Sequence, residues 1–278
     1  MNLDTLITKI ITGAAPCVLE LDLGYSSLPM EFMRGYADKS EAVRAFNRVV
    51  IGTVSDLVPA VSVNVQALLP YGVETIADAV SFAKEKGLFA IADARVSGDE
   101  MAAKASAELY FDIMGADCVT VSPYFGIATY APLFEKAEKE DKCVLVTAHS
   151  QDGNSDELSN LVAGMRPVYR AVCEKTAHLS SSAIGKMGYS RIGISLGGLP
   201  NSTLGELRRA YKDVLFLVTG YDGDETEAHD INAAFDMRGL GALCSVGRVI
   251  TAPSGDGAYS ERLRKRAEEV IRDLKLCF

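Results

Sequence analysis

Eight short apolar runs recur along the chain, and each is followed by a longer stretch in which apolar and polar residues alternate with helical spacing. The apolar runs occupy residues 17–22, 60–66, 88–94, 118–122, 143–148, 192–196, 214–220 and 242–250. They are apolar nearly throughout, which is typical of parallel strands covered on both faces. The stretches between them, such as 73–87 and 260–277, predict helices, and Gly87 suits the position just beyond a helix end.

Eight strand–helix units within 278 residues predict a single (β/α)8 TIM barrel that spans residues 1–278 as one domain. A doubly wound open sheet has the same alternation, but it usually has a glycine-rich phosphate turn after its first strand. Here that turn reads Leu21-Asp22-Leu23-Gly24 and lacks the pattern. An additional segment at 4–12 precedes the first strand and is expected to plug the bottom of the barrel.

The composition is that of an ordinary globular protein, with 48% hydrophobic and 23% charged residues and a net charge of −9. No basic cluster outweighs the acids, which argues against a nucleic-acid partner. There is no long apolar run and no N-terminal signal pattern, so we expect no membrane partner and a cytoplasmic location. The six cysteines form no paired motif and suit buried, reduced thiols.

Charged residues follow two of the predicted strands, at the end of the barrel where catalytic groups are found. Asp22 follows the first strand, and Asp93 and Arg95 end the third. Charges in such places are costly to bury unless they are paired, so they are candidates for a functional site. A structural Asp–Arg network that closes the top of the barrel would give the same pattern.

Two reaction classes are disfavoured by what the strand ends lack. No lysine follows a predicted strand, which argues against Schiff-base chemistry. Of the three histidines only His149 lies at a strand end, which argues against a histidine-rich zinc site. Magnesium held by two carboxylates stays open.

The ends of the seventh and eighth strands are the usual phosphate-binding positions of this fold. Gly247 permits close approach of the backbone to an anion, and Arg248 can pair with phosphate oxygens. The facing loop contains Asp222, Asp224 and Glu225. The alternative is therefore a surface arginine that pairs with one of these acids.

Taken in order, several segments resemble the orotidine 5′-phosphate decarboxylase family, particularly its longer bacterial type. The matching segments are 18–22, 56–61, 82–88, 91–94, 115–126, 216–221 and 241–248. The resemblance covers nearly the whole chain. It implies conversion of orotidine monophosphate to uridine monophosphate without a metal or organic cofactor, and a homodimer.

The resemblance also assigns roles to residues. Asp22, Asp93, Arg95 and Asp99 are the implied catalytic set, in which aspartates flank the substrate carboxylate. Binding of substrate or phosphate is implied for a further set: Ser62, Thr120, Ser122, Pro123, Gly220, Tyr221, Gly247 and Arg248.

This sequence departs from the family pattern at the positions where the reaction needs a proton donor. The motif Asp-x-Lys-x-x-Asp has Arg95 at its lysine, and its last aspartate falls on Gly98, or on Asp99 after a shift of one residue. Where the family has a lysine at the end of its second strand, this sequence has Ser62. Where the family usually has a phosphate-binding glutamine, it has Asp224. Arginine holds its proton about two pKa units or more above lysine and is a poor general acid.

Three hypotheses follow from these residues. The first is a decarboxylase or related lyase that acts on a pyrimidine nucleotide through a rearranged charge cage. The second is a non-catalytic descendant that binds a nucleotide or phosphate. The third is a lyase with altered chemistry on another small phosphorylated ligand.

Overall fold

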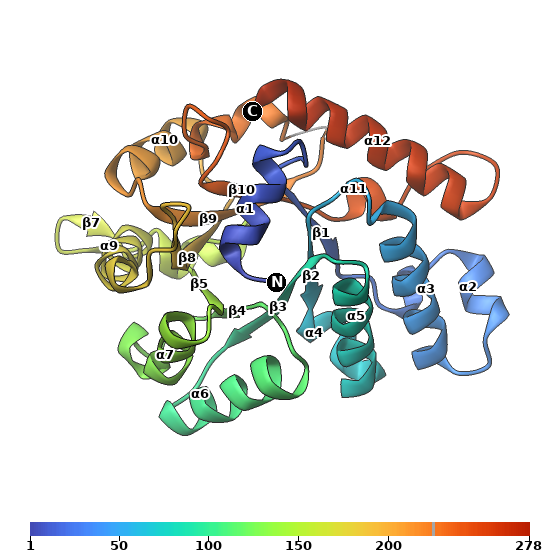
Figure 1. Ribbon diagram of the computed structural model, residues 1–278, viewed down its shortest axis with the longest axis horizontal. Helices are drawn as coiled ribbons and strands as arrows, with labels where there is room; N and C mark the ends of the chain where they lie inside the picture. Colours follow the sequence, from blue (N-terminus) through green and yellow to red (C-terminus); the bar gives the residue numbers. More distant parts are fainter. Residues whose placement is uncertain (224–225) are drawn as a thin grey trace.

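The computed structural model describes residues 1–223 and 226–278, and Asp224 and Glu225 of the predicted phosphate loop lie outside this part. Eight parallel strands close into a barrel in the order β1-β10-β9-β8-β5-β4-β3-β2. Helices surround the ring (Figure 1). The barrel strands are β1 (Cys17–Leu21), β2 (Ala60–Asn64), β3 (Phe89–Val96), β4 (Cys118–Val121), β5 (Cys143–Thr147), β8 (Ser190–Gly197), β9 (Val214–Tyr221) and β10 (Ala242–Val246). The predicted (β/α)8 barrel is confirmed.

The helices are amphipathic and cover the outside of the barrel. Their bounds are α1 (Leu3–Ile11), α2 (Met30–Gly35), α3 (Lys39–Val54), α4 (Val65–Leu68), α5 (Val73–Glu85), α6 (Glu100–Ala107), α7 (Ala131–Lys139), α8 (Asp156–Ser159), α9 (Val168–Ser180), α10 (Asn201–Ala210), α11 (Arg248–Thr251) and α12 (Tyr259–Cys277). Gly87 follows α5 with φ +70°, as the prediction of a helix end there requires. No helix in the described part of the chain is long and apolar enough to span a bilayer.

The barrel strands contribute side chains to two apolar clusters, one inside the barrel and one outside it. The inner cluster contains Val18, Ile91 and Leu217 from the barrel interior together with Leu3 and Leu6 of α1. Helix α1 therefore closes one end of the barrel, as the sequence predicts, and it crosses the centre of the ring in Figure 1. The outer cluster lies between the strands and the surrounding helices.

The eighth predicted strand is too long by four residues. It ends at Val246, and residues 248–251 form α11 instead. Gly247 has φ −104° and ψ −109°, which leaves the extended region and turns the chain out of the sheet. The long connection after β5 contains α8, α9 and an antiparallel pair, β6 (Val162–Ala163) with β7 (Arg166–Pro167).

Gly193 shows how tightly the barrel interior is filled. A Cβ at this position would lie 2.5 Å from the carbonyl oxygen of Leu215 and 2.7 Å from Leu145 Cδ2. Because a backbone oxygen of the neighbouring strand cannot move aside, Gly193→Ala is expected to lower the free energy of unfolding by about 3 kcal/mol. Urea denaturation measures this loss.

The matched control for Gly193→Ala is Gly52→Ala, on the exposed side of α3. A Cβ at residue 52 would meet only Phe82, at 4.0 Å. Helix propensity predicts a gain of about 0.5–1 kcal/mol for that change. Equal unfolding midpoints for the two variants would contradict the packing argument.

Candidate active site

A layer of polar side chains lies directly above the inner apolar cluster, at the carboxyl ends of the strands. Side chains that point into the barrel recur every second residue, so each polar residue follows an inner-cluster residue by two positions. Val18 is followed in this way by Glu20, and Ile91 by Asp93. The same step from the inner cluster on other strands gives Ser62, Thr120, Thr147, Thr219 and Ser245. The mouth of the barrel is therefore polar by pattern.

Asp93, Arg95 and Thr120 form a hydrogen-bonded network on the β3–β4 side of this mouth. The Thr120 hydroxyl donates to Asp93 Oδ1 at 2.7 Å, and it accepts the Arg95 backbone N–H at 2.8 Å. Arg95 Nη2 donates to Asp93 Oδ2 at 3.1 Å. Asp93 is buried and its charge is thus paired and hydrogen-bonded, whereas half of the Arg95 side chain remains exposed (51%). Two of the predicted catalytic residues are in contact.

Arg95 lies two residues after Asp93, on the same side of β3, within a local irregularity of that strand. The β3–β4 register shifts between Ala92 and Val96, and Arg95 has φ +45°, a left-handed conformation that is uncommon for a residue with a side chain. The guanidinium is held at the mouth by its contacts with the Asp93 carboxylate, Nε at 3.4 Å and Nη2 at 3.1 Å.

Asp22 and Arg248 form a second pair, across the β1–β10 side of the mouth. Arg248 Nε donates to Asp22 Oδ2 at 3.1 Å. The guanidinium is mostly exposed (69%), but Asp22 Oδ1 is buried and has no hydrogen-bond partner. A buried carboxylate oxygen without a partner is uncommon and marks this aspartate as a candidate for function. The predicted phosphate arginine is thus held by one of the predicted catalytic aspartates.

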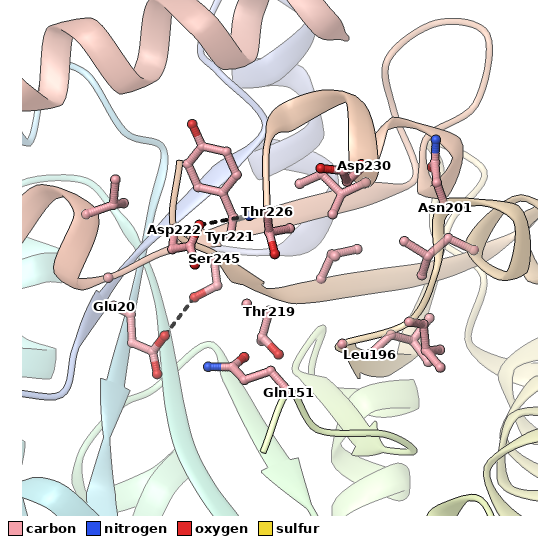
Figure 2. A pocket seen from close by; sticks show the side chains of 18 of the residues that line it. Glu20, Gln151, Leu196, Asn201, Thr219, Tyr221, Asp222, Thr226, Asp230 and Ser245 are labelled. Atoms are coloured by element: carbon pink, nitrogen blue, oxygen red, sulfur yellow. Dashed lines mark hydrogen bonds between the residues drawn. The ribbon is translucent and has the colours of Figure 1, made fainter. Parts of the chain in front are cut away.

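A cavity of about 940 Å³ opens between the ends of β1, β8, β9 and β10. Glu20, Asp22, Gly220, Gly247 and Arg248 are among the residues that line it. Figure 2 shows Gln151, from the loop after β5, extending toward the part of the cavity that contains Glu20. The cavity lies beside the predicted phosphate loops, and its size suits a small-molecule ligand.

Asp93 and Arg95 lie outside the lining of this cavity. In the closed ring β3 is four strands away from β9, so their network faces the cavity from the opposite side of the mouth. Both residues nevertheless act electrostatically on Glu20, as does Asp22. Two of the three aspartates of the predicted set, Asp22 and Asp93, therefore act on one carboxyl group.

Other predicted site residues have local roles in the structure. The Asp99 carboxylate caps α6 by accepting the Ala102 N–H at 3.0 Å, and the residue is exposed. Tyr221 lines the cavity, and its ring also belongs to the outer apolar cluster, where burial raises its pKa to about 12. Lys104 of α6 is not among the predicted residues, but it is a nearby amine. Its side chain is exposed and pairs with Glu100 at 2.7 Å, so it does not supply an amine to the mouth.

The remaining predicted binding residues sit at the strand ends without a shared contact. Ser62 is buried beside Glu20 in the β1–β2 register. Ser122 donates its backbone N–H to Val96 at 2.9 Å, and half-buried Pro123 follows it. A Cβ at Gly220 would lie 3.1 Å from Gln151 Cβ, so the loop after β5 rests on the phosphate loop there.

His149 connects two strands. Its Nδ1 lies 2.6 Å from the Gly197 carbonyl oxygen, and its Nε2 is 3.2 Å from an oxygen of Asp156. Across residues 1–223 and 226–278, no three His, Cys, Asp or Glu side chains are grouped so that they could hold a metal ion.

Glu20 is the functional candidate that the predicted set lacks. It lines the cavity and accepts a hydrogen bond from Ser245 Oγ at 3.0 Å (Figure 2). The charges of Asp22 and Asp93 also act on it. The sequence offered one signal for it: an acid inside an otherwise apolar strand, two residues after an inward-facing valine. Thr219 and Ser245 also line the mouth, and the same two-residue step predicts their place, whereas nothing in the sequence context of Gln151 distinguishes it.

Fold and site together define a (β/α)8-barrel protein with a carboxylate- and arginine-lined mouth at the carboxyl ends of its strands. Comparison with known proteins shows which proteins this chain is similar to. No family model matches the chain. An orotidine 5′-phosphate decarboxylase from Clostridium perfringens is 29% identical over 276 residues, which cover 96% of each chain. The corresponding Rhodopirellula baltica protein is 28% identical over 254 residues, 86% of this chain and 84% of that one.

Solved structures share the fold. Leishmania donovani OMP decarboxylase superposes with a TM-score of 0.77 at 20% identity and covers 100% of this chain and 99% of its own. The Methanocaldococcus jannaschii orotidine 5′-monophosphate decarboxylase complexed with inhibitor BMP gives 0.58 at 19% identity, with 92% and 98% coverage. The resemblance to the orotidine 5′-phosphate decarboxylase family is confirmed over nearly the whole chain.

Proposed function

We propose that this chain is a carboxy-lyase that converts orotidine monophosphate to uridine monophosphate in pyrimidine biosynthesis, without a metal or organic cofactor. The observation that carries the proposal is the pairing of Asp93 with Arg95 and Thr120 across the mouth from Arg248. Carboxylates and a fixed cation thus face a cavity that ends in a phosphate-type loop. The inhibitor complex of a structural neighbour supports a small-molecule ligand for this fold.

The mechanism follows from the charges. Gly247 and Arg248 hold the phosphate, and Asp22 and Asp93 lie beside the substrate carboxylate. Like charges in a partly dehydrated site repel, and loss of carbon dioxide relieves this repulsion. Arg95 is a preorganised cation that stabilises the negative charge left on the ring carbon.

A second candidate function is a non-catalytic protein that binds a nucleotide or phosphate. The observation in its favour is that no lysine is among the described residues that line the cavity, while Arg95 occupies the motif position of the proton donor. Arginine holds its proton too tightly to deliver it at neutral pH. A lyase that acts on another phosphorylated substrate would use Arg248 in the same way.

Three measurements together separate these functions. A decarboxylase bleaches the absorbance of orotidine monophosphate and restores growth to a uracil-requiring host that lacks the enzyme. A pure binder shows no turnover but gains about 2.7 kcal/mol of stability at uridine monophosphate concentrations of a hundred times the dissociation constant. A lyase with another substrate shows neither effect, and other phosphorylated compounds stabilise it.

Arg248→Ala is expected to weaken binding of uridine monophosphate about tenfold to a hundredfold, because charge-assisted hydrogen bonds to phosphate are lost. Thermal shift against nucleotide concentration measures this, and the exposed position of Arg248 predicts weaker binding at high salt. Arg272→Ala is the control, since that arginine is equally exposed on α12. Equal affinity in all three proteins would contradict the assignment of the phosphate site.

We also propose a homodimer that acts in the cytoplasm. This proposal rests on the sequence resemblance, because members of the family are typically dimers with active sites near the subunit interface. Sedimentation equilibrium of the purified protein tests the assembly state.

A further inference from the structure

Glu20 lies at the floor of the cavity, next to the phosphate-type loop. It points into the barrel from β1, and Ser245 Oγ on the adjacent strand β10 donates to its Oε2 at 3.0 Å (Figure 2). A Cβ at Gly247 would lie 3.5 Å from both Cβ and Oε2 of Glu20. The carboxyl group therefore touches the space that a bound phosphorylated ligand would enter.

The surroundings of Glu20 favour its protonated form. Burial raises its pKa, and the charges of Asp22 and Asp93 raise it further. The hydrogen bond from Ser245 and the charge of Arg95 act in the opposite direction. Arg248 is the other cation beside the group, but it is paired with Asp22. A bound substrate with phosphate and carboxylate groups adds negative charge, which disfavours ionisation of Glu20 still more.

The reaction requires an acidic proton that the expected donor position does not provide. Replacement of carbon dioxide by hydrogen needs a group that transfers a proton to the ring carbon. Arg95 is ill-suited to this, and Lys104 is turned to solvent. Glu20 lines the cavity and is hydrogen-bonded to Ser245 of the neighbouring strand. The charges of Asp22 and Asp93 act on the same carboxyl group.

We propose, on the basis of the decarboxylase function proposed above, that Glu20 is the general acid of the reaction. The bond between the ring carbon and its carboxylate breaks, carbon dioxide leaves, and the electron pair stays on the ring carbon. That pair takes the proton from the Glu20 carboxyl group, which becomes a carboxylate. After the product leaves, Glu20 regains a proton from water, so protons and electrons balance over one turnover.

The experiment is the pH dependence of orotidine monophosphate decarboxylation by the wild type, Glu20→Gln and Glu20→Asp. Because the protonated acid is the active form, wild-type kcat is expected to fall as pH rises through the elevated pKa of Glu20. Glu20→Gln keeps the shape but has no acidic proton, so kcat is expected to fall about 10²–10⁴-fold with little change in KM. Glu20→Asp keeps the proton and should retain part of the activity.

Ser245→Ala provides a readout that a purely structural role for Glu20 would not give. The lost hydrogen bond stabilises the ionised carboxylate, so its removal raises the pKa of Glu20. The fall of kcat is then expected to move to higher pH. Glu135→Gln is the control, since that exposed acid pairs with Lys139 on α7 and should leave the profile unchanged. Thermal unfolding of each variant shows that it folds.

The outcomes distinguish the two proposals. Wild-type turnover with a kcat of Glu20→Gln within threefold of wild type, or an unshifted profile in Ser245→Ala, overturns the role of Glu20 and leaves the decarboxylase function standing. No turnover by the wild-type protein overturns both proposals. Loss of activity in Glu20→Gln together with the shifted profile in Ser245→Ala supports the assignment.

Discussion

Asp93→Asn is expected to reduce kcat for orotidine monophosphate by about 10²–10³-fold, the usual effect of removing one preorganised electrostatic group. Asparagine can still accept the Thr120 hydroxyl, so the geometry is kept while the negative charge is lost. The same change lowers the pKa of Glu20, because the charge of Asp93 helps to raise it. The residual activity of Asp93→Asn should therefore fall at a lower pH than the activity of the wild type. The absorbance assay at several pH values measures both effects.

Asp117→Asn is the matched control for Asp93→Asn. Asp117 is also a buried aspartate, but it precedes β4 at the opposite end of the barrel, where it accepts the Ala90 N–H at 3.0 Å and lies 3.5 Å from Lys84 Nζ. We expect this variant to lose stability and to keep the kcat of its folded fraction. Equal losses of kcat in the two variants would show that the effect of Asp93 is one of folding.

Arg208→Met is expected to lower the free energy of unfolding by about 4 kcal/mol or more, which places it among the most damaging single changes. The buried guanidinium of Arg208 donates to the carbonyl oxygens of Ala234, Gly241 and Val214 at 2.7–2.9 Å, and it stacks 3.9 Å over the Phe216 ring. Burial lowers its pKa to about 10, so it stays charged at neutral pH. Methionine fills similar volume but leaves these oxygens without donors. Chemical denaturation measures the loss.

Arg208→Lys is expected to recover little of this stability, because an ammonium group cannot reproduce the planar fork that reaches several carbonyls at once. The control is Arg209→Ala, one residue further along α10, where the side chain is exposed. That change should alter stability by about 0.5 kcal/mol or less. Comparable losses at the two positions would contradict a role for the carbonyl contacts of Arg208.

The barrel itself was predictable because hydrophobic periodicity is a local property. Runs such as 118–122 and 143–148 predicted β4 and β5 to within a residue at each end, since a strand covered on both faces must be apolar throughout. The prediction was wrong at 247–250, where Gly247 leaves the sheet and α11 begins. Apolar residues of a buried helical turn resemble those of a buried strand over so short a stretch.

The candidate site was predictable in part. Asp93 and Arg95 stand at a strand end in the sequence, and the two-residue spacing and the resemblance both drew attention to them. Both residues are also hydrogen-bonded to Thr120 from the next strand, and local pattern does not encode that contact. Asp99 was assigned by the resemblance alone, after a shift of one residue. Its carboxylate caps α6, because an aspartate just before a helix satisfies the free N–H groups there.

By itself, the sequence determined the eight strands, the helices between them, and which residues reach the carboxyl ends of the strands. Tertiary structure alone decided the partners across the mouth. Arg248 meets Asp22, and Ser245 meets Glu20, only because closure of the barrel sets β10 beside β1, more than 200 residues away in the chain. The periodicity of a strand determines which of its side chains face the core. The charges that gather around Glu20 depend on the register between strands, which no local pattern contains.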